Sequence, residues 1–143
     1  MSLLNQVQDD VKSALKAGDR ERVHALRLIA DALQKAEKDN GDDPVEVLQR
    51  ERKRRLEAAE AYREGGRAET ADAEQREADL IAAYLPEQLS DEELNAIVGD
   101  AVAESGASSP QEMGKVMSLV MPQVKGRADG KRVSAAVKEM LTP

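Results

Sequence analysis

The stretch Leu89-Ser90-Asp91-Glu92-Glu93-Leu94 marks the start of a helix and is the best point from which to interpret this sequence. Ser90 can accept a hydrogen bond from the backbone of Glu93, whose side chain can return one. This is a capping box, and the two flanking leucines occupy the positions of a hydrophobic staple. Such caps stabilise a helix by about 1 kcal/mol. Pro86 lies just upstream and predicts the end of whatever helix precedes it.

Downstream of this start, the pattern predicts two further short helices. Gly106 follows the first helix, and Ser109-Pro110-Gln111-Glu112 predicts a second capping box with proline at the first helical position. That second helix is expected to end before Pro122. Asp129 is placed to cap the last helix.

Upstream of Pro86 the sequence predicts four longer helices, which begin near Ser2, Asp19, Asp43 and Arg67. Gly18 and Gly65 are natural helix stops, and the fourth helix is expected to run to Leu85. The apolar face expected for the first helix consists of Leu3, Leu4, Val7, Val11 and Leu15.

These features predict an all-α, multihelical protein. Ala, Leu, Glu, Arg, Lys and Gln dominate, and no alternating strand pattern occurs. We expect about seven helices in two subdomains. Residues 1–86 would form a subdomain of long helices, and residues 87–143 a subdomain of three shorter ones.

The composition excludes several classes of chemistry. The 143 residues carry a net charge of −7, with no Cys, one His and two Tyr. Disulfides, Cys-ligated metals and thiol nucleophiles are therefore excluded, whereas a carboxylate-only Mg²⁺ or Ca²⁺ site is not. Two tyrosines are too few for base-stacking platforms. We expect no cofactor.

The sequence also predicts that the protein is soluble and cytoplasmic. The longest apolar run, Leu80–Leu85, has six residues, far fewer than a membrane span requires. The N-terminus has no basic region followed by an apolar stretch, so no signal peptide is expected. We therefore expect no membrane partner.

Charge placement points to one candidate site. Residues 113–138 contain six cations and a single acid, so this segment is +5 within an acidic chain. Its centre, residues 125–132, is a loop with Gly126 and Gly130 that leads into the last helix. Exposed amides at a helix start, beside Arg and Lys, make a good phosphate site. The alternative is a capped turn whose charges are solvated.

This loop does not match a nucleotide-binding P-loop. Three residues rather than four separate Gly126 from Gly130, Lys131 is followed by Arg132, and no strand precedes the loop.

Two other features favour structural interpretations. The cluster Arg50–Arg55 spreads around more than one helical turn, which favours a salt-bridged, exposed helix over an RNA-contacting one. His24 has no second His or Cys to share a ligand, so we expect a structural role.

Several segments resemble the GatB/YqeY family, and in particular its stand-alone YqeY-like proteins. The resemblance covers essentially the whole chain. The segments that carry it are Met1-Ser-Leu-Leu4, Arg22–Leu28, Ala83–Leu94, Met113-Gly-Lys-Val-Met117 and Met121–Gly130.

The resemblance implies an all-helical fold in two subdomains and a link to tRNA. The C-terminal part is similar to the tail domain of the B subunit of glutamine-dependent aspartyl/glutamyl-tRNA amidotransferase, which engages tRNA. Carbon–nitrogen ligase activity with glutamine as amido-N donor follows by homology only, because the kinase-like cradle that binds ATP and metal is absent. We therefore expect no catalysis by this chain alone.

Carried over to this sequence, the resemblance makes five cations candidate RNA contacts, and the two loop glycines complete the site. The expected partner is tRNA or a tRNA-processing complex. The alternative is a helical adaptor whose Met and Leu faces bind a partner protein without RNA. The candidate RNA- or phosphate-binding residues are Lys115, Lys125, Gly126, Arg127, Gly130, Lys131 and Arg132.

Overall fold

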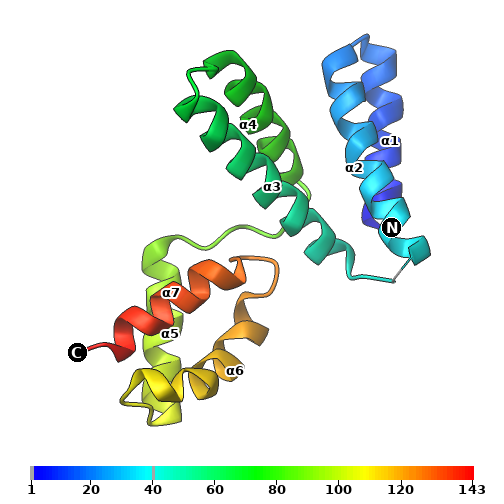
Figure 1. Ribbon diagram of the computed structural model, residues 1–143. Coiled ribbons are helices and arrows are strands. Elements are labelled where there is room, and N and C mark those ends of the chain that lie inside the picture. Colours follow the sequence, from blue (N-terminus) through cyan, green and yellow to red (C-terminus); the bar gives the residue numbers. More distant parts are fainter. Residues whose placement is uncertain (1, 40) are drawn as a thin grey trace. The chain divides into compact units, whose positions relative to one another are not determined.

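The computed structural model describes residues 2–39 and 41–143 (Figure 1). Across these residues it contains seven α-helices, one short 3₁₀ helix and no strand, which confirms the all-α prediction. The chain divides into two compact units, Met1–Leu85 and Pro86–Pro143, and each has its own apolar core. Whether the two units behave as separate domains stays a prediction.

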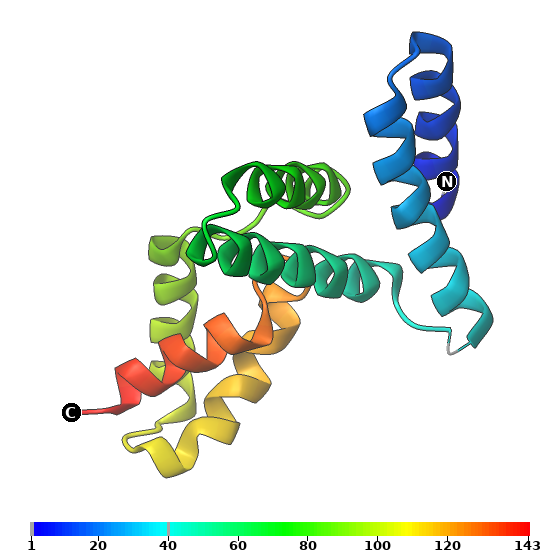
Figure 2. The ribbon, with the colours of Figure 1, turned by 45° about the horizontal axis from the view of Figure 1, so that its top comes forward.

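The first unit consists of two helical hairpins. Helix α1 (Leu3–Ala17) packs against α2 (Arg20–Asp39), and α3 (Pro44–Glu64) packs against α4 (Ala68–Ala82), as both ribbon views show (Figure 1, Figure 2). The predicted starts of the first three helices are confirmed. Their caps are local side-chain bonds: Ser2 Oγ accepts from Asn5 N, Asp19 Oδ1 from Arg22 N, and Asp43 Oδ1 from Val45 N.

The predicted apolar face of α1 is correct except at its end. Val7 and Ala14 are buried, but Leu15 is 52% exposed. At 3.6 residues per turn, Ala14 lies only about 20° around the helix from Val7, whereas Leu15 lies about 80° away. The buried stripe therefore passes through Ala14, and Leu15 projects beside it.

The second unit is a three-helix arrangement around a valine-rich core. Helix α5 (Asp91–Ser105) is followed by the 3₁₀ turn η1 (Pro110–Glu112), α6 (Met113–Val124) and α7 (Gly130–Leu141). The predicted cap of α5 is confirmed in one direction, since Ser90 Oγ accepts from Glu93 N at 3.1 Å and Leu89 and Leu94 are both buried. The expected return bond from Ser90 N to the Glu93 carboxylate is not formed, and that carboxylate lies 4.0 Å from Arg127. The fully buried valines of this core are Val98, Val116, Val120, Val124, Val133 and Val137.

Two helix ends differ from the prediction. Helix α4 stops at Ala82, three residues before Leu85, and the chain tightens into i→i−3 bonds such as Leu85 N to Ala82 O at 3.1 Å. Pro86 explains this, because a following proline disfavours the α conformation of Leu85. Helix α6 continues two residues past Pro122, which sits in its last turn.

The second predicted capping box forms only in part. Glu112 N donates to the backbone oxygen of Ser109 rather than to its hydroxyl, so the first turn is the 3₁₀ turn η1. The Glu112 carboxylate instead accepts from Ser108 N at 3.2 Å and from the hydroxyls of Ser108 and Ser109 at 3.3 Å. The Glu112 carboxylate, and not the Ser109 hydroxyl, is therefore the side-chain acceptor that stabilises this turn.

No helix in the described part of the chain is both long enough and apolar enough to cross a bilayer.

Candidate functional site

The candidate loop is a tight turn with a capped helix at its end. Gly126 has a φ of +79°, a conformation that glycine adopts without strain. The N–H groups of Arg127 and Ala128 both donate to Val124 O, at 2.8 and 3.1 Å. Asp129 then caps α7, because its Oδ1 accepts from Arg132 N at 2.8 Å. The predicted cap is confirmed.

Residues 86–89 hold this loop from the other side. Gln88 Nε2 donates to the oxygens of Gly126 and Pro86, at 2.8 and 2.9 Å, and Leu89 N donates to Arg127 O at 2.9 Å. The Arg127 side chain returns a bond from Nε to Glu87 O at 3.2 Å. The loop is therefore fixed by several bonds between segments about 40 residues apart. Gln88 and Glu87 carried no motif that could have predicted this role.

Both arginines of the site face acids from the start of α5. Arg132 Nη2 and Nε donate to Asp91 Oδ1 at 2.8 and 3.3 Å, and Arg127 Nη2 lies 4.0 Å from Glu93 Oε2. The sequence segment around the arginines contains Asp129 alone, and the fold supplies these two further carboxylates. The Asp91 side chain is 88% exposed, so this pair contributes only about 0–1 kcal/mol.

The remaining cations are not all in one place. Lys131 is exposed and forms no ion pair within the part of the chain that the structure describes, and Lys125 is exposed at the end of α6. Lys115 lies in the first turn of α6, ten residues and about 15 Å along the helix before Lys125, and it pairs with Glu112 at 3.5 Å. Six of the seven predicted residues thus lie in the loop and at the start of α7, and Lys115 lies apart from them.

Electrostatics around Lys115 favour a structural role. The pKa of Glu112 is lowered from its ordinary value, mainly because the backbone N–H of Ser108 donates to its carboxylate, and the nearby Lys115 ammonium adds to the effect. Lys115 therefore sits beside a carboxylate that stays ionised.

The two loop glycines have different reasons to be glycine. Gly126 is buried and needs its positive φ for the turn. Gly130 begins α7 with an ordinary φ, and a Cβ there would meet no atom within 4 Å. Gly130 therefore leaves open space in front of the helix start.

Three of the five cations in the basic cluster of α3 form ion pairs, as the favoured interpretation predicts, whereas Arg52 Nε is buried without a hydrogen-bond partner among the described residues. Arg55 pairs with Glu51 at 2.8 Å and with Glu77 of α4 at 3.1 Å, and Arg54 also reaches Glu51 at 3.4 Å. At the start of the helix Arg50 pairs with Asp42 at 3.1 Å. These contacts tie α3 to itself and to its neighbours.

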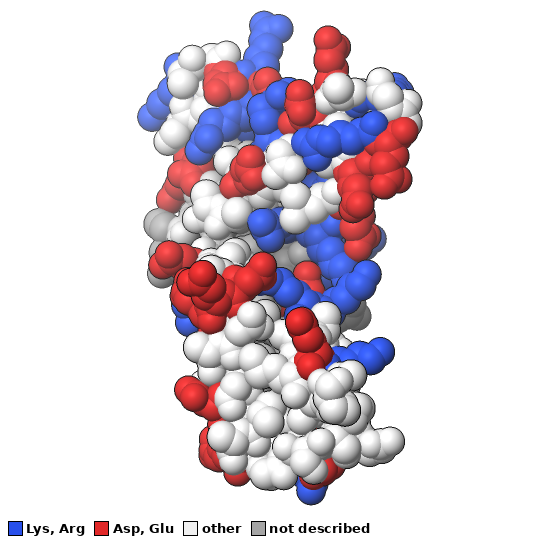
Figure 3. All heavy atoms as spheres, turned by 90° about the vertical axis from the view of Figure 1, so that its left-hand side faces the viewer, with Lys and Arg blue, Asp and Glu red and all other residues white. Residues whose placement is uncertain are grey.

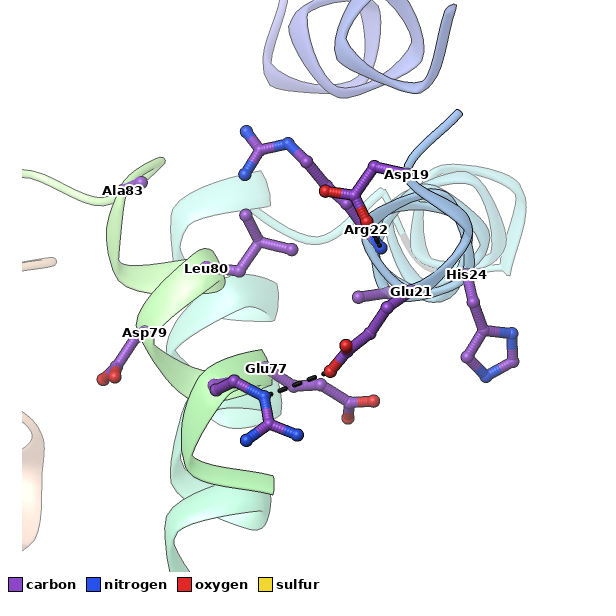
Figure 4. Close-up of a pocket in the computed structure, with 10 residues that line it drawn as sticks. Asp19, Glu21, Arg22, His24, Glu77, Asp79, Leu80 and Ala83 are labelled. Atoms are coloured by element: carbon purple, nitrogen blue, oxygen red, sulfur yellow. Dashed lines mark hydrogen bonds and ion pairs between the residues drawn. The ribbon is translucent and has the colours of Figure 1, made fainter. Parts of the chain in front are cut away.

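A concave region lies between α2 and α4 in the first unit. It is a cavity of about 490 Å³ crossed by an ion pair between Glu21 Oε1 and Arg76 Nε at 3.1 Å (Figure 4). Leu80 points into it, whereas His24 points away from it toward solvent. Its lining mixes four acids with two arginines, so it favours no single charge of ligand.

The described residues contain no cluster of side chains suited to bind a metal ion. Within residues 2–39 and 41–143, no three His, Asp or Glu side chains are placed to hold a metal ion.

Comparison with known proteins identifies the family. The family model described as "Yqey-like protein" matches residues 4–141, which covers both units. The chain belongs to this family. No curated protein matches the sequence.

Proposed function

We propose that this member of the family is an accessory module that binds tRNA, or another structured RNA, through residues 125–132. Its role would lie in or near glutamine-dependent tRNA amidotransferase chemistry, without catalysis by this chain alone. The observation that carries the proposal is that Lys125, Arg127, Lys131 and Arg132 all lie within residues 125–132, a tight turn that ends at the capped start of α7.

The chemistry of that helix start suits a phosphate. The first N–H groups of a helix have no partner within the helix, and they favour an anion. In α7 the Asp129 carboxylate already binds the N–H of Arg132, so the N–H groups of Gly130 and Lys131 are the ones left for a phosphate. Gly130 leaves the approach to them open, and Lys131 is exposed beside them. Arginine adds bidentate hydrogen bonding to phosphate oxygens.

The ion pairs of the two arginines limit affinity rather than forbid binding. The Arg132–Asp91 and Arg127–Glu93 pairs are exposed enough to be exchanged for phosphate contacts at small cost. Asp91 and Glu93 would then lie near the bound phosphate and repel it. We therefore expect modest affinity that falls steeply with salt.

The binding mode would be directed at the RNA backbone. Both tyrosines of the chain, Tyr62 and Tyr84, belong to the first unit, so the second unit offers no aromatic ring for stacking on bases. Phosphate contacts position a nucleic acid without reading its sequence. Shape and charge would decide which RNA binds.

Filter binding of tRNA across a salt series tests the proposal. With about four phosphate contacts, log K against log salt should fall with a slope of about 3 to 4. Reversing Lys125, Arg127, Lys131 and Arg132 to Glu should abolish binding. A matched control reverses four exposed cations of the first unit to Glu, namely Lys35, Lys38, Lys53 and Arg63, which changes the net charge equally.

Equal loss of binding in both quadruple variants would mean that net charge, and not this site, governs RNA affinity. Unchanged binding in the site variant would refute the site. A parallel assay of glutamine-dependent amidation, with ATP and mischarged tRNA, should give no product with the pure chain.

One observation favours the protein adaptor as a second candidate. The face of the second unit shown in Figure 3 is mostly free of charged side chains, and Met140 is 40% exposed in this unit. A surface with few charges offers little to the phosphates of RNA and suits an uncharged protein surface better. Association with a defined partner that resists both RNase and high salt would support this alternative.

A further inference from the structure

The α1–α2 hairpin carries a groove that the proposed RNA site does not use. Two cavities, of about 360 and 560 Å³, open between the two helices. Arg27 lines both cavities, and together they are called the hairpin groove. The groove is lined by Asn5, Gln8, Asp9, Val11, Lys12, Ala14, Leu15 and Gly18 from the α1 side and by Arg20, Val23, His24, Arg27 and Ala30 from α2.

The groove has the dimensions of a helix-binding site. It follows α1 from Asn5 to Gly18, which is about 20 Å at 1.5 Å per residue. Arg20, His24 and Arg27 are spaced i, i+4 and i+7, so they form one row along α2. A third helix of about four turns would fit between this row and α1.

The floor and rim of the groove are apolar. Ala14 and Val23 are buried at its base, and Val11 and Ala30 are partly buried. Leu15 is 52% exposed on the rim, the largest exposure among the large apolar residues that the structure describes. This leucine is the residue that the amphipathic pattern predicted to be inside, so its face of the hairpin is left without a partner.

The cations of the groove are available for a ligand. Lys12, Arg20 and Arg27 are exposed and make no ion pair or side-chain hydrogen bond with any residue that the structure describes. Asp9 is the acid of the lining. The groove is thus positive on the surface of a protein with a net charge of −7.

We propose that this groove binds an acidic amphipathic helix of a partner protein. The apolar side of the partner would cover Leu15, Val11 and Val23, and its carboxylates would meet Lys12, Arg20 and Arg27. Helix-in-groove recognition uses this combination of apolar anchors at helical spacing and flanking charges. Complementary charge sets the orientation of the partner and speeds its association.

The lining favours a helix over RNA. Its apolar floor has nothing to match in a phosphate backbone, whereas it suits the apolar side of an amphipathic helix.

Selection from a display library of random peptides, each about 18 residues long to span the groove, tests the proposal on the intact chain. We expect the enriched peptides to be acidic, with apolar residues at i, i+3, i+4 and i+7. Fluorescence anisotropy then measures their binding. The double variant Arg20→Glu/Arg27→Glu should weaken it about tenfold or more, since two attractive pairs become repulsive.

The matched control is Lys35→Glu/Lys38→Glu, which makes the same charge change on α2 outside the groove and should leave binding within about twofold. Leu15→Ser should weaken the same peptides without any change of charge at the cations. Peptides that are not acidic, or that bind the Arg20/Arg27 variant equally well, would overturn the proposal. Two other results would also overturn it. The Arg20→Glu/Arg27→Glu variant could lose binding of an RNA oligonucleotide, or lose a dimer seen in sedimentation, while it still binds the peptides.

Discussion

Two arginine pairs, one in each unit, show how differently the fold treats cations. Arg127 and Arg132 lie in the most basic segment of the sequence, yet each faces a carboxylate from the start of α5. Arg20 and Arg27 lie in a segment of mixed charge, yet neither has an acidic partner among the described residues. A run of positive charge along a sequence therefore does not show which cations are free to bind.

The cause is the range of the interactions. Asp91 lies 41 residues before Arg132, so no local pattern pairs them. Helix α2 contains acids near its arginines, but Glu21 turns to Arg76 of α4 instead. The basic loop is thus partly neutralised by the fold, and the hairpin groove is left positive.

The largest expected effect comes from a variant that unfolds the second unit while the first unit stays folded. Val116→Asp places a carboxylate in the valine core, where an unpaired charge costs on the order of 4 kcal/mol or more. Hydrogen exchange should show loss of protection in α5–α7, while α1–α4 stay protected. RNA binding should then disappear, while the acidic peptides still bind.

Ser118→Asp is the matched control, because it adds the same single negative charge at an exposed position two residues further along α6 and should leave the second unit folded. If Val116→Asp removed protection from both units together, they would fold as one cooperative body. The two binding surfaces could then not be tested separately.

Helix starts could be predicted from the sequence because a cap is a local interaction. Ser2, Asp19, Ser90 and Asp129 each bind a backbone N–H three residues ahead, so the residue and its spacing suffice. Ser109 shows the limit of this approach. Its motif matches a capping box as well as that of Ser90, but this segment forms a 3₁₀ turn. In that turn the Ser109 hydroxyl donates to the Glu112 carboxylate instead of accepting from a backbone N–H.

This difference between caps gives a second prediction. Ser90→Ala should cost about 1 kcal/mol, because it leaves the N–H of Glu93 without its partner. It should also loosen the helix start that presents Asp91 to Arg132. Ser109→Ala removes no bond to a backbone N–H, so urea unfolding should show a smaller loss. Equal losses would mean that the Ser109 hydroxyl caps the helix in solution.

The site itself was predictable only in part. The glycines, the cap and the cations of residues 125–132 could be recognised in the sequence, and the structure confirms the turn at Gly126 and the cap at Asp129. The clamp from Gln88 and the carboxylates of Asp91 and Glu93 could not, because they depend on how α5 packs beside the loop. The hairpin groove escaped prediction for a similar reason, since it depends on the register of two antiparallel helices.

A charge cycle at Arg132 and Asp91 gives a third, smaller effect. Arg132→Asp should lose about 0.5 kcal/mol of stability, because it removes an exposed pair and adds an acid beside Asp91. The swapped variant Arg132→Asp/Asp91→Arg should recover most of that loss in thermal unfolding. Arg27→Asp has no pair to lose, so its loss should be clearly smaller, below about 0.2 kcal/mol. A loss at Arg27 as large as that at Arg132 would contradict the claimed difference between the two regions.

The smallest effect concerns the Lys115–Glu112 contact, which separates Lys115 from the candidate loop. The pKa of Glu112 is lowered from its ordinary value of 4.5, chiefly by the hydrogen bond from Ser108 N. Folding therefore favours the ionised carboxylate, so its stabilisation is present above about pH 4.5 and is lost as the pH falls through the lowered pKa.

Glu112→Gln should remove that pH dependence. The parent should lose slightly more thermal stability than the variant between about pH 6 and about pH 3. NMR titration of the Glu112 carboxyl in Lys115→Gln separates the two causes. If the hydrogen bond from Ser108 dominates, most of the lowering persists without the ammonium group. If instead the pKa returns to its ordinary value, the ion pair is the stronger contact, and Lys115 is committed to Glu112 even more firmly.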